Sequence, residues 1–119
     1  MYLRQLIGKR GEDLACDYLI KNNYTILDRN FYCYQGEIDI IAKDLEKNEL
    51  VFFEVKTRTN SKFGKPVDAV NKYKKLHLFK SCKYYLYKNH IYNSFVRVDV
   101  IEVFLKSNSF FINHIKQIF

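Results

Sequence analysis

The chain has 119 residues, 48% of them hydrophobic, and a formal net charge of +7. This length corresponds to one domain that folds unaided, and no apolar run is long enough to span a membrane. The N-terminus lacks the apolar segment of a secretory signal, and the three scattered cysteines exclude a disulfide framework. We therefore expect a single cytoplasmic domain over residues 1–119 whose cysteines are small buried hydrophobes.

The positive charge is concentrated in the second half of the chain. Residues 1–54 hold 7 basic and 10 acidic side chains, whereas residues 55–119 hold 13 basic and 3 acidic ones. Between Val55 and His90 the only acid is Asp68, against ten lysines and arginines. Such a density is typical of a surface that binds phosphates, although a solvated lysine-rich helix is the alternative. Its position along the chain favours a polyanionic partner.

The predicted elements follow the order α, β, β, β, α, β with a small terminal addition. Apolar residues at three- and four-residue spacing predict a helix from about Leu3 to Asn22. β-Branched and aromatic residues predict strands over 24–33, 36–43 and 49–57. The later elements are a long helix from about Val67 to Lys88, a strand over 95–105, and a short strand with a turn of helix over 109–119.

Two of these strands form a predicted hairpin that carries carboxylates in an otherwise apolar pattern. With the loop centred between residues 46 and 47, facing residues have numbers that sum to 93, so Asp39 opposes Glu54. By the same register Glu37 opposes Lys56. Directly opposed Cβ atoms lie about 4.5 to 5.5 Å apart, so the two carboxylates would share one small volume.

The two faces of this hairpin differ in character. One face is apolar throughout and comprises Ile38, Ile40, Ala42, Val51, Phe53 and Val55. The other face is apolar only near the loop, at Ile41, Leu50 and Phe52. We therefore expect helices to cover both faces of the sheet and to leave the charged end open as a site.

Adjacent carboxylates in a partly desolvated position need either a raised pKa or a bound cation. Mg²⁺ meets this need, because it takes oxygen ligands, one or two carboxylates and several waters. Lys56 lies on the same face, where it would orient or deprotonate a water or stabilise charge on phosphorus. The alternative is a solvent-facing hairpin edge at Asp39 and Glu54, with Glu37 and Lys56 as an ion pair worth at most about 1 kcal/mol.

An acid on one strand followed by Glu-x-Lys on the next resembles the PD-(D/E)xK core of restriction-endonuclease-like nucleases, with Ile38 in place of the usual proline. A longer series of motifs resembles the YraN-like family over nearly the whole chain. These motifs are GxxGExxA (8–15), YxILxRN (24–30), GEIDIIA (36–42), FxEVKxR (52–58), FGxPxxAV (63–70) and HIK (114–116).

The resemblance implies a three-layer α/β fold of order αβββαβ, with a mixed central sheet flanked by helices. It also implies a phosphodiesterase site that depends on Mg²⁺ or Mn²⁺. Asp39 and Glu54 match the metal-binding acids, with the backbone carbonyl of Val55 as a third ligand, and Lys56 matches the catalytic lysine.

Two further glutamates match acids of the family motifs. Glu12 corresponds to an acid that related resolvases bring to the site from the first helix, and its alternative is a surface glutamate. Glu37 either lies beside the metal or pairs with Lys56. No function is assigned to Arg97 and Asp99, which alternate with buried valines.

The predicted nucleic-acid contacts are the polar and basic residues that follow the Glu-x-Lys strand. They lie in the next loop and in the first turns of the second helix: Arg58, Ser61, Lys62, Lys65, Lys72, Lys74 and Lys75. For Lys74 a solvated side chain is the alternative. Contacts to phosphate predict an affinity that falls with salt and little base specificity.

These observations lead to the hypothesis of a metal-dependent endonuclease that acts on structured or branched DNA. Resolvase-like relatives act as dimers, so the resemblance also implies a homodimer. A nucleic-acid-binding protein on an inactive nuclease fold is the main alternative, and a protein-interaction domain is the third.

Overall fold

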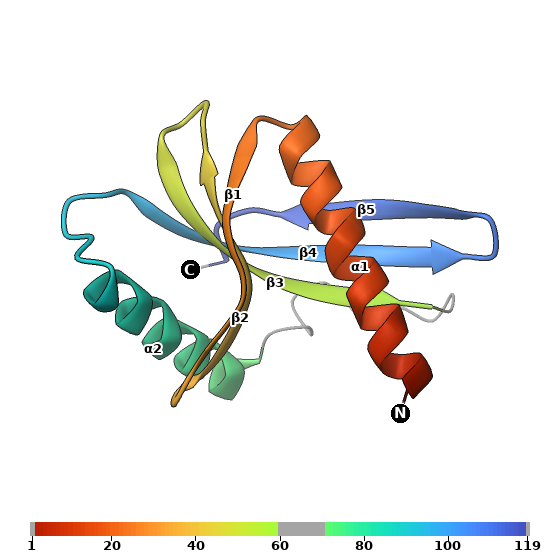
Figure 1. Cartoon of the computed structure of the whole chain (residues 1–119), viewed down its shortest axis with the longest axis horizontal. Helices are drawn as coiled ribbons and strands as arrows, with labels where there is room; N and C mark the ends of the chain where they lie inside the picture. Colours follow the sequence, from red (N-terminus) through yellow and green to blue (C-terminus); the bar gives the residue numbers. More distant parts are fainter. Residues whose placement is uncertain (1, 60–70, 119) are drawn as a thin grey trace.

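The chain folds into a five-stranded mixed sheet with one helix on each face (Figure 1). The computed structural model describes residues 2–59 and 71–118. In chain order the elements are α1 (Tyr2–Lys21), β1 (Tyr24–Cys33), β2 (Gly36–Asp44), β3 (Glu49–Arg58), α2 (Lys72–Lys88), β4 (Val96–Lys106) and β5 (Ser109–Ile115).

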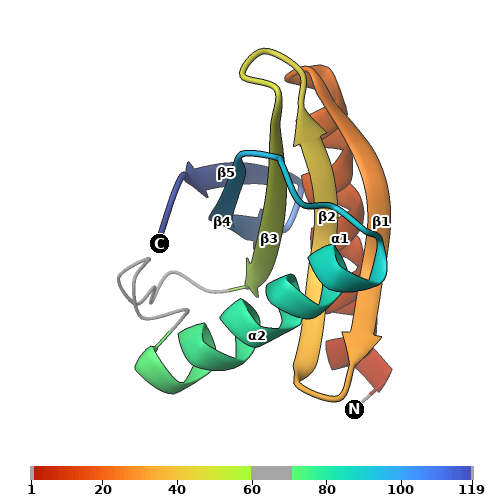
Figure 2. The same cartoon turned by 90° about the vertical axis from the view of Figure 1, so that its left-hand side faces the viewer.

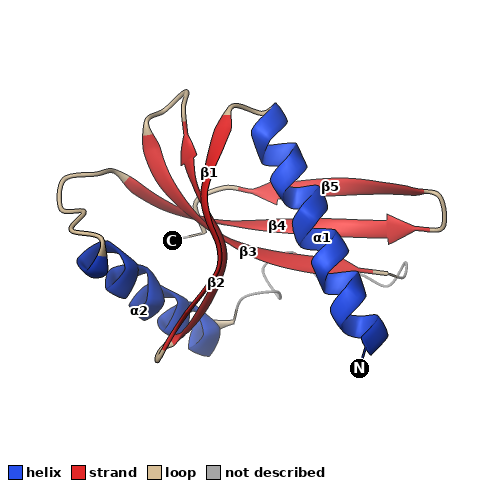
Figure 3. Ribbon diagram, in the orientation of Figure 1, coloured by secondary structure: helices blue, strands red, loops and turns tan. Residues whose placement is uncertain are grey.

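The strands lie in the order β1-β2-β3-β4-β5. The β3–β4 pair is parallel and the other neighbouring pairs are antiparallel, which confirms the predicted mixed sheet (Figure 3). Within residues 2–59 and 71–118, neither helix has the length and apolar character needed to cross a bilayer.

The α1 helix covers one face of the sheet and comes very close to β3. Its buried residues Ala15, Cys16 and Leu19 pack on the sheet. The residues of β2, β3 and β4 in this core are Ile40, Ala42, Val51, Phe53, Ile101 and Val103. A Cβ atom on Gly11 would lie only 1.9 Å from Oγ1 of Thr57. Only glycine permits this approach, which fixes the position of the next residue, Glu12, over the sheet.

The α2 helix covers the other face, mainly against β2 (Figure 2). Leu78, Cys82 and Tyr85 of α2 pack against Ile38, Ile41, Leu50, Phe52 and Val98. The two core cysteines, Cys16 and Cys82, are buried as predicted, whereas Cys33 is half-buried, and all three are free thiols.

The boundaries of two predicted elements are wrong. The second helix begins at Lys72 rather than Val67, because Asn71 is extended (φ −79°, ψ 177°) and its side chain caps the helix by accepting a bond from the Lys74 N–H. Residues 67–70 lie outside the described residues. Residues 116–118 do not form a helical turn, since the N–H groups of Gln117 and Ile118 donate to Asp99 and Val98 of β4.

The β2–β3 hairpin has the predicted register, but the two strands separate before their ends. Facing residues sum to 93 from Asp44–Glu49 to Ile40–Phe53, where the ladder stops. From there β2 continues with β1, and β3 continues beside β4 (Figure 1). The predicted pairs Asp39–Glu54 and Glu37–Lys56 are therefore not part of the ladder. We call this separation point the strand fork.

At the fork β2 also rotates about its own axis, so that side chains two residues apart point to opposite faces of the sheet. Ile40 packs in the core beneath α1, whereas Ile38 packs in the core beneath α2. Residues two apart in a regular strand share one face. The prediction that Ile38 and Ile40 share a face is therefore wrong, because the strand rotates at Asp39, which lies between them.

The neighbouring strand β1 rotates at the same level. Arg29 donates to Asp13 of α1 at 2.8 Å, whereas the ring of Phe31 packs on Tyr85 of α2 with 5.1 Å between ring centroids. Asn30, between them, has a φ of 53°, a left-handed conformation that asparagine tolerates better than most residues. The twist of both strands thus turns Asp39 toward the fork.

Candidate active site

Asp39 and Glu54 are both buried at the strand fork. Oδ2 of Asp39 accepts a hydrogen bond of 2.8 Å from the N–H of Val55, the residue after Glu54. This bond replaces the ladder that ends one residue earlier and holds the Asp39 carboxylate against β3. The predicted proximity of the two acids is therefore present, although it arises from a side-chain contact and not from regular strand pairing.

The field around Asp39 is strongly negative. Burial raises the pKa of Asp39 to about 7, and the charge of Glu54 acts in the same direction. Glu12 and Glu37 raise it further, whereas the bond from Val55 lowers it. Three carboxylates, one each from α1, β2 and β3, thus act on Asp39, which is a setting that favours a cation. We call Asp39, Glu54, Glu12 and Glu37, together with Lys56, the acidic site.

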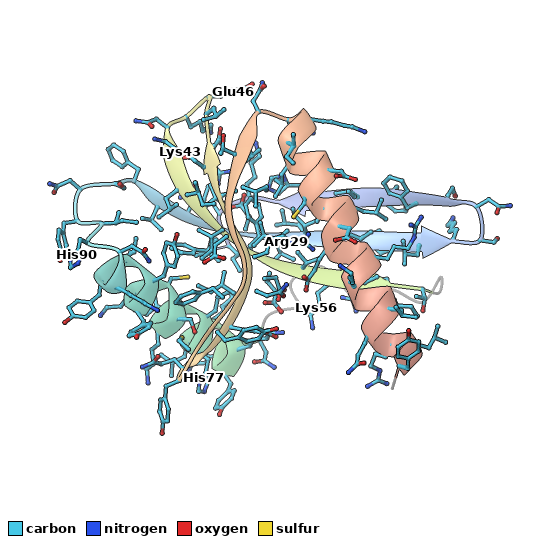
Figure 4. The ribbon with its side chains drawn as sticks, in the orientation of Figure 1. Arg29, Lys43, Glu46, Lys56, His77 and His90 are labelled. Atoms are coloured by element: carbon cyan, nitrogen blue, oxygen red, sulfur yellow. The ribbon has the colours of Figure 1, made fainter. Side chains whose placement is uncertain are left out.

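Glu12 reaches this region from α1 and is not a fully solvated surface residue. Burial raises its pKa, and a hydrogen bond from the Asn30 side chain and the charge of Arg29 partly offset that effect. The Arg29 guanidinium lies 3.8 Å from Oε1 of Glu12 (Arg29 is labelled in Figure 4). The close contact of Gly11 with β3 therefore serves to hold this carboxylate near the fork.

Two lysines from different elements meet at Glu54. Lys74 of α2 forms an ion pair with Oε1 of Glu54. Lys56 of β3, labelled in Figure 4, lies beside Lys74, and burial together with that neighbouring charge lowers the pKa of Lys56. Burial would also lower the pKa of Lys74, but its bond to Glu54 outweighs this and raises it. Lys74 is thus a partner of the acidic site, which differs from a solvated helical lysine.

The other predicted nucleic-acid contacts occupy different surroundings. Arg58 is ion-paired at 3.3 Å with Glu102, a buried residue of β4. Lys72 is exposed and Lys75 is half-buried on α2. The remaining predicted contacts, Ser61, Lys62 and Lys65, lie outside the described residues.

The oxygen atoms at the fork fit a hard divalent cation. In a strand, the N–H and C=O of one residue point to the same side, and the Val55 N–H points at Asp39. From this geometry we expect the Val55 carbonyl to face the same gap as the Asp39 carboxylate. Among the described parts of the chain, no three His, Cys, Asp or Glu side chains are grouped to hold a metal alone. Two carboxylates, one carbonyl and waters form the kind of ligand set that Mg²⁺ takes.

A second buried charge cluster is centred on β4, and the sequence analysis assigned no function to its residues Arg97 and Asp99. Arg97 of β4 is only 4% exposed and donates to Asp99, Asp44, Glu49 and the hydroxyl of Tyr24 at 2.6 to 3.0 Å. We call these residues, with His114, the Arg97 cluster. The detectable signal was a pair of opposite charges, two residues apart, inside a run of valines.

Asp99 is the centre of the Arg97 cluster. Nε2 of His114 donates to Asp99 at 2.7 Å, and Nδ1 of His114 accepts from the Tyr18 hydroxyl at 2.9 Å. Burial would raise the pKa of Asp99, but the bonds from His114, Arg97 and Gln117 hold it below its usual value. The cluster ties β4 and β5 to α1 and to the hairpin, which is a structural role.

The fold and site define a mixed α/β protein with a buried acidic pair, served by two lysines, at a fork in its sheet. The chain belongs to Uncharacterised protein family UPF0102, whose family model matches residues 11–103. The motifs that resemble the YraN-like family therefore reflect membership of this family.

The relatives cover most of the chain. A UPF0102 protein of Clostridium botulinum is 48% identical over 89% of this chain and 85% of its own length. A UPF0102 protein of Carboxydothermus hydrogenoformans is 44% identical over 97% and 96% of the two chains. One from Caldicellulosiruptor bescii is 47% identical over the full length of both.

Proposed function

We propose that the protein is a divalent-metal-dependent endonuclease of the restriction-endonuclease-like fold that hydrolyses phosphodiester bonds in structured or branched DNA. The observation that carries this proposal is the acidic site. Asp39 and Glu54 are buried side by side at the strand fork, with Lys56 two residues further along the same strand. The order of elements and the mixed sheet agree with such a fold.

Asp39, Glu54 and the Val55 carbonyl are the groups that would hold Mg²⁺ or Mn²⁺. When bound, the ion would polarise the scissile phosphate and lower the pKa of a water molecule. Asp39 needs such a partner most, since burial and the charge of Glu54 raise its pKa to about 7. The Val55 N–H keeps its carboxylate oriented toward β3.

Lys56 is placed to move a proton or to stabilise charge on the phosphate. Its pKa is lowered by burial and by Lys74, so its amine gives up its proton more readily than that of a solvated lysine. Glu12 adds negative charge from α1 and would help to orient water on that side of the site.

The positive second half of the chain favours a nucleic acid as the substrate. Residues 55–119 hold 13 basic and 3 acidic side chains. Lys72 and Lys75 lie in the first turn of α2, the same turn that carries Lys74, the partner of Glu54 at the acidic site. The branched form of the substrate and a homodimeric assembly rest on the resemblance to resolvases.

A second function, nucleic-acid binding without cleavage, is favoured by one observation. Lys74 already neutralises Glu54, so the buried acid has a partner that is not a metal. A protein that had lost its chemistry would keep this ion pair and the basic surface.

The test is a panel of linear, flapped and four-way DNA, and the matching RNA, incubated with Mg²⁺ or Mn²⁺. We expect cleavage by the wild-type protein, loss of cleavage in Glu54→Gln and Lys56→Ala, and retained folding by circular dichroism. Glu46→Gln, an exposed change in the β2–β3 loop, is the matched control and should cut normally. Binding without cutting by the wild-type protein, and no heat of Mn²⁺ binding in calorimetry, would establish the second function instead.

A further inference from the structure

We infer that Lys74 is a displaceable counter-ion of the acidic site: it neutralises Glu54 in the metal-free protein and leaves for a substrate phosphate when a divalent ion binds. This inference rests on the proposed function, because it concerns the same site. It adds an order of events to that site and assigns the task to a residue outside the Glu-x-Lys motif.

The first argument is the need of Glu54 for a cation. Glu54 is buried beside a second buried carboxylate, Asp39, and an uncompensated charge in such a position is costly. The ion pair with Lys74 supplies the missing charge. Lys74 comes from α2, whereas Asp39, Glu54 and Lys56 all belong to the sheet.

The second argument is the difference in exposure between the two partners. The side chain of Lys74 is 41% exposed, whereas that of Glu54 is 7% exposed. Glu54 is fixed within β3, but Lys74 has a long flexible stem whose amine lies at the boundary with solvent. The lysine is therefore the partner that can leave without unfolding the site.

The third argument is repulsion. The amines of Lys56 and Lys74 are neighbours, and the Lys74 amine pairs with Glu54. A divalent ion bound to Asp39 and Glu54 would add two more positive charges at the same place. Lys74 is the cation that can move away, because it belongs to the first turn of α2, whereas Lys56 belongs to β3, the strand that carries Glu54.

The backbone of α2 decides where the released amine can go. The Lys74 N–H is fixed by the Asn71 cap at 2.9 Å, so the residue stays in the first turn of the helix. Its amine remains within one side-chain length of Glu54 and therefore of a phosphate held by the metal. Metal binding and phosphate binding therefore strengthen one another. The metal replaces Lys74 as the partner of Glu54, and the phosphate replaces Glu54 as the partner of Lys74.

The experiment compares Lys74→Gln with Lys80→Gln, which removes the same charge from an exposed position of the same helix. In EDTA we expect Lys74→Gln to lower the melting temperature and Lys80→Gln to leave it unchanged. In calorimetry without DNA, Lys74→Gln should bind Mn²⁺ roughly two- to fivefold more tightly, which is the range for removing one partly screened charge. Lys74→Arg keeps the charge and should retain the affinity of the wild-type protein.

The outcomes separate the inference from the proposed function. Wild-type binding of Mn²⁺ with an unchanged or weaker affinity in Lys74→Gln would overturn the counter-ion role alone. Absence of Mn²⁺ binding by the wild-type protein would overturn both proposals. If Lys74→Gln does not fold, an affinity for Mn²⁺ in Lys74→Arg several-fold different from that of the wild-type protein would contradict the inference.

Discussion

The Arg97 cluster and the acidic site each contain buried carboxylates of one sheet, yet these carboxylates are balanced differently. In the Arg97 cluster each carboxylate has a cationic or polar donor at hydrogen-bond distance, and the pKa values of Asp44 and Asp99 lie below their usual value. In the acidic site Asp39 accepts a bond from the neutral N–H of Val55 and from no cation among the described residues, and burial together with the charge of Glu54 raises its pKa to about 7. A cluster whose carboxylates each bond to a cation is balanced and holds a fold together, whereas a buried carboxylate without such a bond, here Asp39, is unbalanced and favours a bound cation.

The largest expected effect is on stability, from breaking the balanced cluster. Arg97→Met removes the cation that serves Asp99, Asp44 and Glu49 and leaves buried carboxylates without a partner. We expect a loss of about 3 to 5 kcal/mol in the free energy of unfolding, measured with urea. Arg4→Met, an exposed change on α1, is the control and should cost almost nothing. A loss below about 1 kcal/mol would show that the cluster is not structural.

The next largest effect is a gain in stability when a carboxylate of the acidic site is neutralised. Because the pKa of Asp39 is raised from 3.8 to about 7, ionised Asp39 destabilises the folded protein. The metal-free wild-type protein should therefore lose stability as the pH rises through this interval and level off above it. Asp39→Asn should remove that loss and be more stable than the wild type at pH 8, by an amount on the order of a few kcal/mol.

Urea unfolding at pH 5 and pH 8 in EDTA measures this difference. Asp17→Asn, an exposed change on α1, should leave the pH dependence unaltered. Mn²⁺ should stabilise the wild-type protein at pH 8 and have little effect on Asp39→Asn. Equal pH dependence of stability in the wild type and in Asp39→Asn would show that ionisation of Asp39 does not cause the loss of stability.

A smaller effect is expected when Glu12, one carboxylate of the acidic site, is displaced by a change at its neighbour Gly11. Gly11→Ala would place a Cβ atom 1.9 Å from Oγ1 of Thr57, so α1 must shift away from β3. We expect a loss of about 1 to 3 kcal/mol together with weaker metal binding, since Glu12 moves with the helix. Gly8→Ala has nothing within 4 Å and should stabilise the helix by up to about 1 kcal/mol, which makes it the matched control. Thermal melts and Mn²⁺ calorimetry test both variants, and equal results for the two would contradict the close contact.

The sequence was sufficient for the local features of the fold. The position of the hairpin loop, centred between residues 46 and 47, was enough to predict the register of β2 and β3, because a hairpin pairs neighbouring segments. Alternation identified most of the buried residues, and the hairpin register predicted that Asp39 and Glu54 lie close together. The order of elements followed from the same local patterns.

The missed features depend on contacts between distant segments. Both before and beyond the strand fork β3 pairs with β4, whose residues come much later in the chain (Leu50 pairs with Val96), and no local pattern indicates that pairing. The ion pair between Lys74 and Glu54 and the close contact of Gly11 with Thr57 depend on how the helices dock. The rotation at Asn30 has a local cause in its left-handed backbone, but asparagine alone does not reveal it.

The parallel pairing of β3 with β4 also sets an order of assembly. β1, β2 and β3 pair with strands adjacent in the sequence, whereas α2 separates β4 from β3 along the chain. Pairings between distant segments form slowly. We therefore expect the nascent chain to hold Asp39 and Glu54 on an early three-stranded meander, and the repulsion between them to be relieved only when α2 delivers its amine.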